Sequence, residues 1–156
     1  MFHLMDHPDN RTEPSSDPIR LTYLIGRLDH AVRRELDKRL AAHDLTVAQF
    51  TTLSVLTFRP GLSNAQLARR VYVTPQSMNA VLNDLEGKGL ITRKTSPEHR
   101  RVLEATLTEE GRATTETCHK YAAEVEELML AGSTPTERER LAHVIRGCLD
   151  RLNGAV

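Results

Sequence analysis

Residues 86–111 read EGKGLITRKTSPEHRRVLEATLTEEG. Two short segments of strand-forming residues, about 90–94 and 101–107, flank a Ser-Pro turn signal. The pattern predicts two short strands joined by a turn. The adjacent Arg100 and Arg101 fall at the tip, where a side chain is hard to bury and well placed to reach a partner.

The second predicted strand leads directly into a helix. Its side chains alternate, with Leu103, Ala105 and Leu107 expected inward and Glu104 and Thr106 outward. Thr108 is the expected N-cap of the long helix that follows. One side of that helix carries Tyr121, Val125, Leu128 and Met129, and Gly132 is expected to end it.

Three helices are predicted upstream of the strands. A capping box formed by Thr46 and Gln49 predicts a helix that runs through about Phe58. A second capping box, formed by Ser63 and Gln66, predicts a short helix over SNAQLARRV. Thr74-Pro75 opens the next helix, which Gly87 and Gly89 close. Only the residues VYVT join the second of these helices to the third, a spacing typical of a helix-turn-helix.

The two ends of the chain supply two more helices. Apolar residues at helical spacing follow Asp17-Pro18, so we expect a helix capped by Asp17 and ending near His43. A third capping box, Thr134 to Glu137, opens the last helix. Residues 1–16 are rich in Pro, Ser and charge and are expected to form a disordered arm.

Charge is balanced over the chain but segregated along it. The 21 Lys and Arg equal the 21 Asp and Glu. Residues 59–101, however, hold eight basic and three acidic side chains, a local net of +5. The surplus lies on the helix-turn-helix and the hairpin, and it is the electrostatic footprint of phosphate contact.

The helix opened by Thr74-Pro75 has two distinct faces. Met78, Val81, Leu82 and Leu85 share one face and fit burial. The opposite face holds Gln76, Asn79, Ala80 and Asn83, with Thr74 and Ser77 near the start. Amides and hydroxyls can pair with base edges, although a solvated amphipathic helix shows the same pattern.

From Asp17 to Leu152 the chain resembles the MarR family of winged helix-turn-helix transcriptional regulators. The resemblance rests on residues 86–111, which look like the family's wing and its Leu-Thr-x-x-Gly helix start, and on NAQLARRVYVTPQSMNAVLNDLE upstream. It implies a mainly α fold of six helices with a small β-wing, intertwined as a dimer. Residues 17–156 would form the domain, with dimerisation helices at 17–43 and 134–153 and the winged helix-turn-helix at about 46–108.

The same resemblance implies a regulator that binds a palindromic double-stranded operator as a homodimer. Arg101 would enter the minor groove, with Arg100 beside it on the backbone. The expected DNA-binding residues are Thr74, Gln76, Ser77, Asn79, Asn83, Lys94, His99, Arg100 and Arg101. His99 replaces the family's usual acidic residue, so either other contacts hold the wing or its tip is sensitive to pH.

The resemblance also implies repression that a small aromatic or phenolic effector relieves. Pro60, Thr74, Arg93 and His30 are the candidate effector residues. Pro60, Thr74 and Arg93 also fit a turn proline, a helix cap and a phosphate-binding arginine, and His30 also fits a surface residue.

Other classes of function have less support. The sequence shows no phosphate-cradling glycine loop, nucleophile elbow or metal-type Cys/His spacing, so we expect no enzyme, cofactor or metal. Cys118 and Cys148 are expected to pack, in a cytoplasmic protein without a membrane span. The remaining alternative is a winged-helix module that binds protein instead of DNA.

Overall fold

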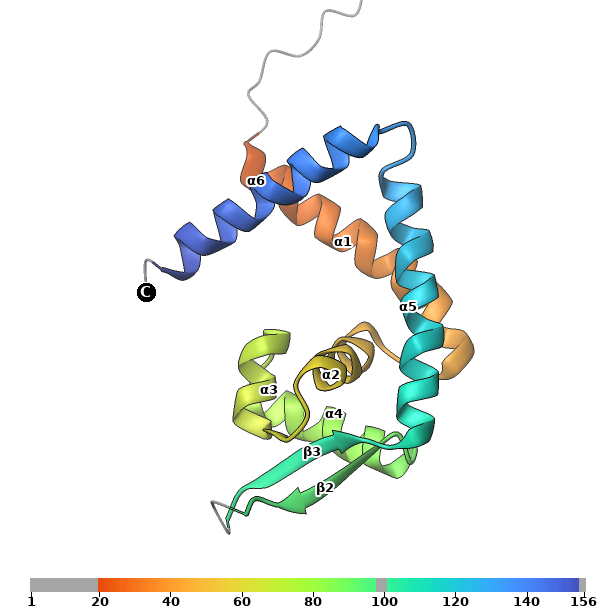
Figure 1. Ribbon diagram of the computed structural model, residues 1–156, viewed down its shortest axis with the longest axis vertical. Coiled ribbons are helices and arrows are strands. Elements are labelled where there is room, and N and C mark those ends of the chain that lie inside the picture. The colour runs from red at the N-terminus through yellow and green to blue at the C-terminus, as the bar shows by residue number, and fades with distance from the viewer. Residues whose placement is uncertain (1–19, 98–100, 155–156) are drawn as a thin grey trace, which may run out of the picture.

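The computed structural model describes residues 20–97 and 101–154, which form a helical protein with one small sheet (Figure 1). The predicted fold class is confirmed in its helices and its wing. The helices are α1 (Leu21–Leu40), α2 (Val47–Phe58), α3 (Asn64–Val71), α4 (Pro75–Gly87), α5 (Glu109–Met129) and α6 (Pro135–Asn153), and a 3-10 turn, η1 (Ala41–His43), follows α1.

The predicted N-caps lie at the starts of most helices. The Thr46, Ser63 and Thr134 capping boxes are all formed, and Thr74 and Thr108 cap α4 and α5 by accepting from Ser77 N and Gly111 N. The predicted start of the first helix is wrong, because Arg20 is extended at ψ 133 and serves as the N-cap of a helix that begins at Leu21. Asp17 itself lies outside the described residues.

The sheet has three strands where two were predicted. In it β3 (Leu103–Leu107) lies between β1 (Leu62–Ser63) and β2 (Ile91–Thr95), and both pairings are antiparallel. The two-residue β1 pairs Leu62 with Ala105. Ala105 and Leu107 are buried as expected, whereas Leu103 is 50% exposed because β3 extends past the core at this end.

The core lies in the lobe formed by α2, α3, α4 and the sheet (Figure 1). Residues with no exposed surface include Leu53 of α2, Leu67 of α3, and Met78 and Leu85 of α4. Each buried Val, Leu, Ile or Met side chain contributes roughly 1.5–3 kcal/mol. The core therefore fixes α3 and α4 relative to each other.

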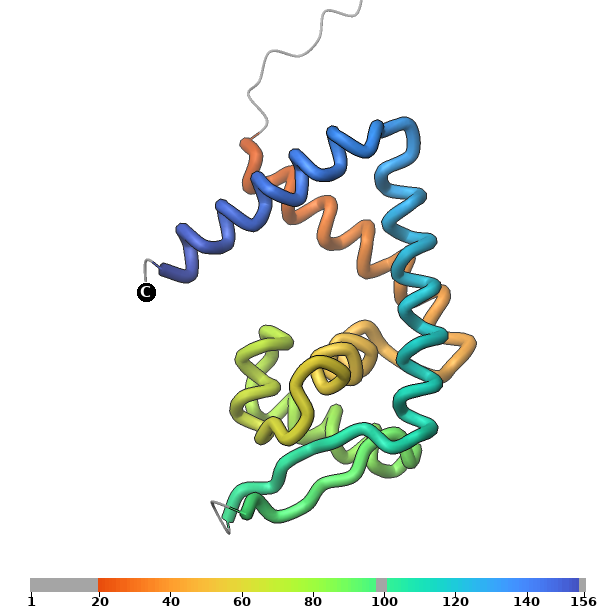
Figure 2. Tube along the Cα trace, in the orientation of Figure 1, coloured from red at the N-terminus to blue at the C-terminus, as the bar shows by residue number. Residues whose placement is uncertain are grey.

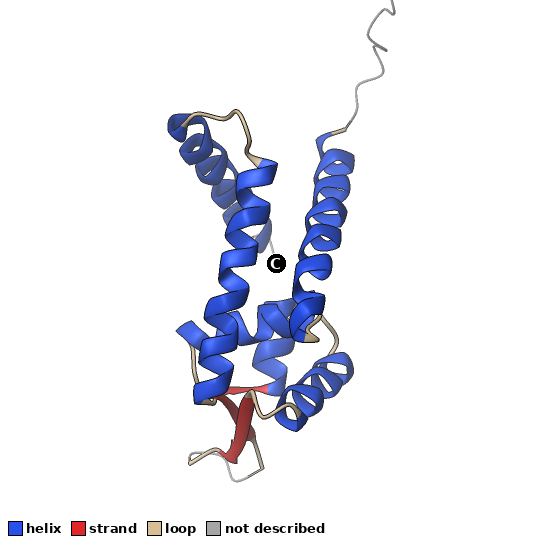
Figure 3. Ribbon diagram, turned by 90° about the vertical axis from the view of Figure 1, so that its right-hand side faces the viewer, coloured by secondary structure: helices blue, strands red, loops and turns tan. Residues whose placement is uncertain are grey.

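The helix α5 joins this lobe to the opposite end of the molecule. Gly111, in its first turn, lies so close to Leu90, the residue before β2, that an added Cβ would be 1.9 Å from the Leu90 carbonyl oxygen. Figure 3 shows α1 and α5 rising from the lobe as two long helices. Figure 2 shows α6 at the far end from the hairpin. None of the described residues of α6 is buried.

Candidate nucleic-acid interface

The helices α3 and α4 form a helix-turn-helix with three residues between them. Tyr72 takes a left-handed conformation at φ 59, and Val73 N donates to the Ala68 carbonyl at 3.1 Å. Met78, Leu82 and Leu85 are buried on one side of α4. The core thus holds α4 with its opposite face outward, in the manner of a recognition helix.

The outward face of α4 carries the residues predicted to read bases. Gln76, Ser77, Asn79 and Asn83 are all exposed. Within the described ranges, the side chains of Gln76 and Asn79 make no hydrogen bond, so their amides are available to a base edge. Asn83 differs, because its Oδ1 accepts a 2.8 Å hydrogen bond from the Arg93 guanidinium.

The start of α4 presents two exposed hydroxyl groups, those of Thr74 and Ser77. Thr74 Oγ1 accepts from Ser77 N at 3.1 Å and donates to Ser77 Oγ at 2.9 Å. Both residues are exposed. Hydroxyl groups can donate to a phosphate oxygen, so this end of α4 suits a phosphate through its side chains.

The wing carries two exposed cations at its outer part. Lys94 lies opposite Glu104 in the β2–β3 register, and Arg101 lies in the turn before β3. Neither Lys94 nor Arg101 forms an ion pair with another described residue. The other two predicted wing contacts, His99 and Arg100, lie outside the described residues.

Arg93 instead joins the wing to the recognition helix. Its guanidinium lies 2.5 Å from Glu86 Oε2, its backbone N–H donates to the same carboxylate, and its side chain is 17% exposed. The hydrogen bond from Arg93 holds the pKa of Glu86 below its ordinary value. The charge of Arg93 is therefore balanced by Glu86, whereas no described residue forms an ion pair with Lys94 or Arg101.

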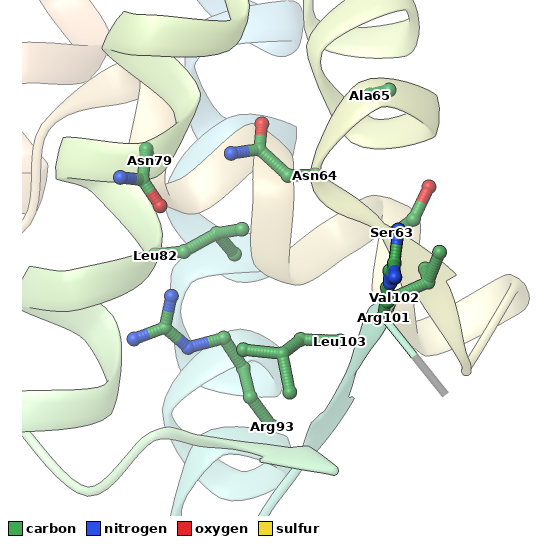
Figure 4. A pocket seen from close by; sticks show the side chains of 9 residues that line it. All are labelled: Ser63, Asn64, Ala65, Asn79, Leu82, Arg93, Arg101, Val102 and Leu103. Atoms are coloured by element: carbon green, nitrogen blue, oxygen red, sulfur yellow. The ribbon is translucent and has the colours of Figure 1, made fainter. Parts of the chain in front are cut away.

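A hollow of about 350 Å³ opens between α4 and the wing (Figure 4). Asn79 and Leu82 line it from α4, Arg93 from β2, and Asn64 and Ala65 from α3. Ser63, Arg101, Val102 and Leu103 complete the lining. No local sequence pattern predicts that the start of α3 and Arg101 line the same hollow, because their proximity depends on the pairing of β1 with β3.

The four candidate effector residues lie in different places. Arg93 lines the hollow beside the wing, and His30 lines a separate depression on α1 with Tyr23 and Arg27. Pro60 is exposed after α2, Thr74 caps α4, and neither lines those two hollows.

The two cysteines differ in their burial. Cys118 is fully buried, and this burial raises the pKa of its thiol. Cys148 is half-buried, and Arg151 Nη2 lies 3.4 Å from its sulfur. Across residues 20–97 and 101–154, no three His, Cys, Asp or Glu side chains gather as a metal site requires, and no helix could cross a membrane.

Known proteins resemble this chain in sequence and in fold. The family model described as MarR family matches residues 43–102. The HTH-type transcriptional repressor Rv2887 of Mycobacterium tuberculosis is 39% identical over 125 residues, which cover 80% of this chain and 90% of the relative.

Two solved structures of Rv2887 are also similar. Its complex with salicylic acid has a TM-score of 0.71 and 35% identity, covering 85% of this chain and 98% of that one. Its complex with DNA has a TM-score of 0.72 and 33% identity, covering 83% and 97%. This chain belongs to the MarR family of winged helix-turn-helix transcriptional regulators.

Proposed function

We propose that this protein is a repressor that binds a palindromic DNA operator as a two-fold dimer and is released by a small aromatic acid. The observation that carries the proposal is the outward amide face of α4 beside the exposed cations Lys94 and Arg101. Amides can read bases in the major groove, and arginine in the wing suits a narrow minor groove. The complex of Rv2887 with DNA supports this assignment.

Uncovered apolar faces at the end away from the wing support dimerisation. On α1, Leu21, Leu24, Ile25 and Leu28 are between 43% and 68% exposed; on α6, Leu141, Val144, Ile145, Leu149 and Leu152 are between 42% and 71% exposed. Apolar faces of this extent mark an interface of the large obligate kind. We therefore assign residues 17–43 and 134–153 to dimerisation and residues 46–108 to DNA binding.

The proposed effector class rests on the positive charge of Arg93 and on the ligand of the relative Rv2887. Rv2887 has been solved with salicylic acid, an aromatic carboxylate. In this chain Arg93 is the candidate cation that would bind the carboxylate of such an acid. Pro60, Thr74 and His30 are further candidate residues of the effector site. Arg93 already forms an ion pair with Glu86. The carboxylate of an effector would therefore have to replace the Glu86 carboxylate, and it would also disturb the Arg93–Asn83 hydrogen bond. We place this activity in the cytoplasm, where a bacterial operator is found.

Selection from genomic DNA tests the proposal. Sheared fragments are captured by the immobilised protein, eluted with salt and sequenced, with Gln76→Ala/Arg101→Ala as a matched control. We expect wild type to enrich one imperfect palindrome with half-sites about 34 Å apart. Salicylate should elute the same fragments. Equal enrichment by wild type and control would refute the proposed interface.

A further inference from the structure

The dimerisation helix α1 reaches the DNA-binding lobe through a short corner, residues 41–46. After η1, Asp44 takes a left-handed conformation at φ 52, which is uncommon for a residue other than glycine. Its backbone N–H donates to the Ala41 carbonyl at 3.1 Å. Leu45, next in the chain, is buried in the lobe. This corner sets the angle at which α1 leaves the lobe.

Lys88, directly after the recognition helix, holds this corner from the lobe side. Its Nζ donates to the Asp44 carbonyl at 2.5 Å and lies 3.2 Å from the Asp44 carboxylate. It also lies 2.8 Å from Asp84 Oδ2, one turn earlier on α4. One ammonium thus joins the end of α4 to a residue 44 positions earlier in the chain.

Gln49 of α2 completes the cluster. Its side chain is buried, its Nε2 donates to Asp84, and its Oε1 accepts from Thr46 N at 2.9 Å. The cluster of Asp44, Gln49, Asp84 and Lys88 therefore connects the corner, the start of α2 and the end of α4. The Lys88 hydrogen bond lowers the pKa of Asp84, which keeps that carboxylate ionised as a partner.

The geometry of Lys88 differs from that of a DNA contact. Its ammonium group already contacts the carboxylates of Asp44 and Asp84 and the Asp44 carbonyl, and the side chain of Lys88 is 24% exposed. An ordinary ion pair within α4 would involve Asp84 alone. The contacts with Asp44 add a link between the lobe and the dimerisation helix.

We propose that Lys88 is a positioning residue that fixes the angle between α1 and the lobe, and hence the separation of the two recognition helices on DNA. The effect on DNA rests on the proposed function. A two-fold dimer contains two copies of the corner. The same change at both corners would therefore move both lobes and alter the separation of the recognition helices twice over.

The corner itself is tested without DNA. Nitroxide labels are placed at Arg34→Cys on α1 and Gln76→Cys on α4, in a Cys148→Ser background in which the remaining Cys118 is buried. The labelled chain is diluted with unlabelled protein so that the distance within one chain is measured. We expect Lys88→Met to broaden or shift this distance, and Lys88→Arg to retain it. Lys120→Met, which removes an exposed charge on α5, is the control.

The consequence for DNA is tested with unlabelled variants on three duplexes. They carry the selected palindrome, the same palindrome with one added base pair between its half-sites, and a single half-site. Couplings of this kind change affinity by about twofold to thirtyfold, and we expect Lys88→Met to reduce the preference for the natural spacing by such a factor. Binding to the single half-site should not change, and Lys88→Arg should restore the preference.

The distance measurement and the DNA-binding measurement distinguish failure of this proposal from failure of the proposed function. An unchanged label distance in Lys88→Met overturns the proposal whether or not the protein binds DNA. An equal loss of affinity on all three duplexes would identify Lys88 as a phosphate contact and also overturn it. If wild type binds no duplex, the proposed function fails, and the distance still decides the role of Lys88 at the corner.

Discussion

Replacing Gly111 by Ala should destabilise the protein at the junction of the wing and α5. An added Cβ would lie 1.9 Å from the Leu90 carbonyl oxygen and 2.9 Å from its carbonyl carbon. Both are backbone atoms, so no side-chain rotation can relieve the contact. The same carbonyl accepts a hydrogen bond from Thr108 N at 3.1 Å, which ties it to the start of α5.

The magnitude follows from two opposed effects. Overpacking costs about 1–3 kcal/mol, and a backbone contact this short belongs at the upper end. The better helix propensity of Ala returns up to about 1 kcal/mol. A net loss of about 2 kcal/mol corresponds to a decrease in Tm of roughly 4–8 °C for a domain of this length.

The assay is a thermal melt followed by far-UV circular dichroism at one fixed protomer concentration, because dimerisation makes Tm depend on concentration. Gly87→Ala is the matched control. It lies at the end of α4 with nothing within 4 Å of an added Cβ, so Tm should stay or rise by the equivalent of about 0.4–1 kcal/mol. A Gly111→Ala variant that melts at or above the wild-type temperature would refute the close approach of α5 to the Leu90 backbone.

Three further predictions concern the interface. Arg101→Ala should weaken binding by about 1–3 kcal/mol per half-site without lowering Tm, and fluorescence anisotropy with a parallel melt checks both. Gln76→Ala or Asn79→Ala should relax the preference at particular base pairs while leaving the salt dependence nearly unchanged; retained preference with lost salt dependence would contradict the assigned face. Because Arg93 lowers the pKa of Glu86, their ion pair stabilises the fold above the ordinary glutamate pKa of about 4.3 and loses this effect as the pH falls. The Tm difference between wild type and Glu86→Gln should therefore shrink from pH 7 to pH 3, and a constant difference would exclude this linkage.

The elements predicted well from sequence are those whose signals are local. Thr46, Ser63 and Thr134 cap the helices they were expected to cap, because a capping box spans only four residues. The buried face of α4 followed from spacing alone. These local signals were sufficient to place the helix-turn-helix and the hairpin.

The features that sequence did not reveal depend on contacts between distant segments. The strand β1 has two residues, and one of them, Ser63, also caps α3, so no alternation marks it. Lys88 was counted with the cations of the basic segment, but its partner Asp44 lies 44 residues away. Leu103 follows the alternation of its strand and is exposed nevertheless, because burial depends on where the core ends.

The salt dependence of operator binding tests the central claim most directly. With Lys94 of both protomers on phosphates and Arg101 of both protomers in the minor groove, four cations displace counterions from the DNA. The plot of log Kobs against log salt concentration should then have a slope of roughly −3.6 or steeper, a loss of about 150-fold or more between 50 and 200 mM. Binding isotherms at four salt concentrations, on the selected palindrome and on a scrambled duplex, measure this slope. We expect a steep slope on both duplexes and tighter binding to the palindrome. Retention of neither duplex, or affinity indifferent to salt, would contradict it and favour a winged-helix module that binds protein.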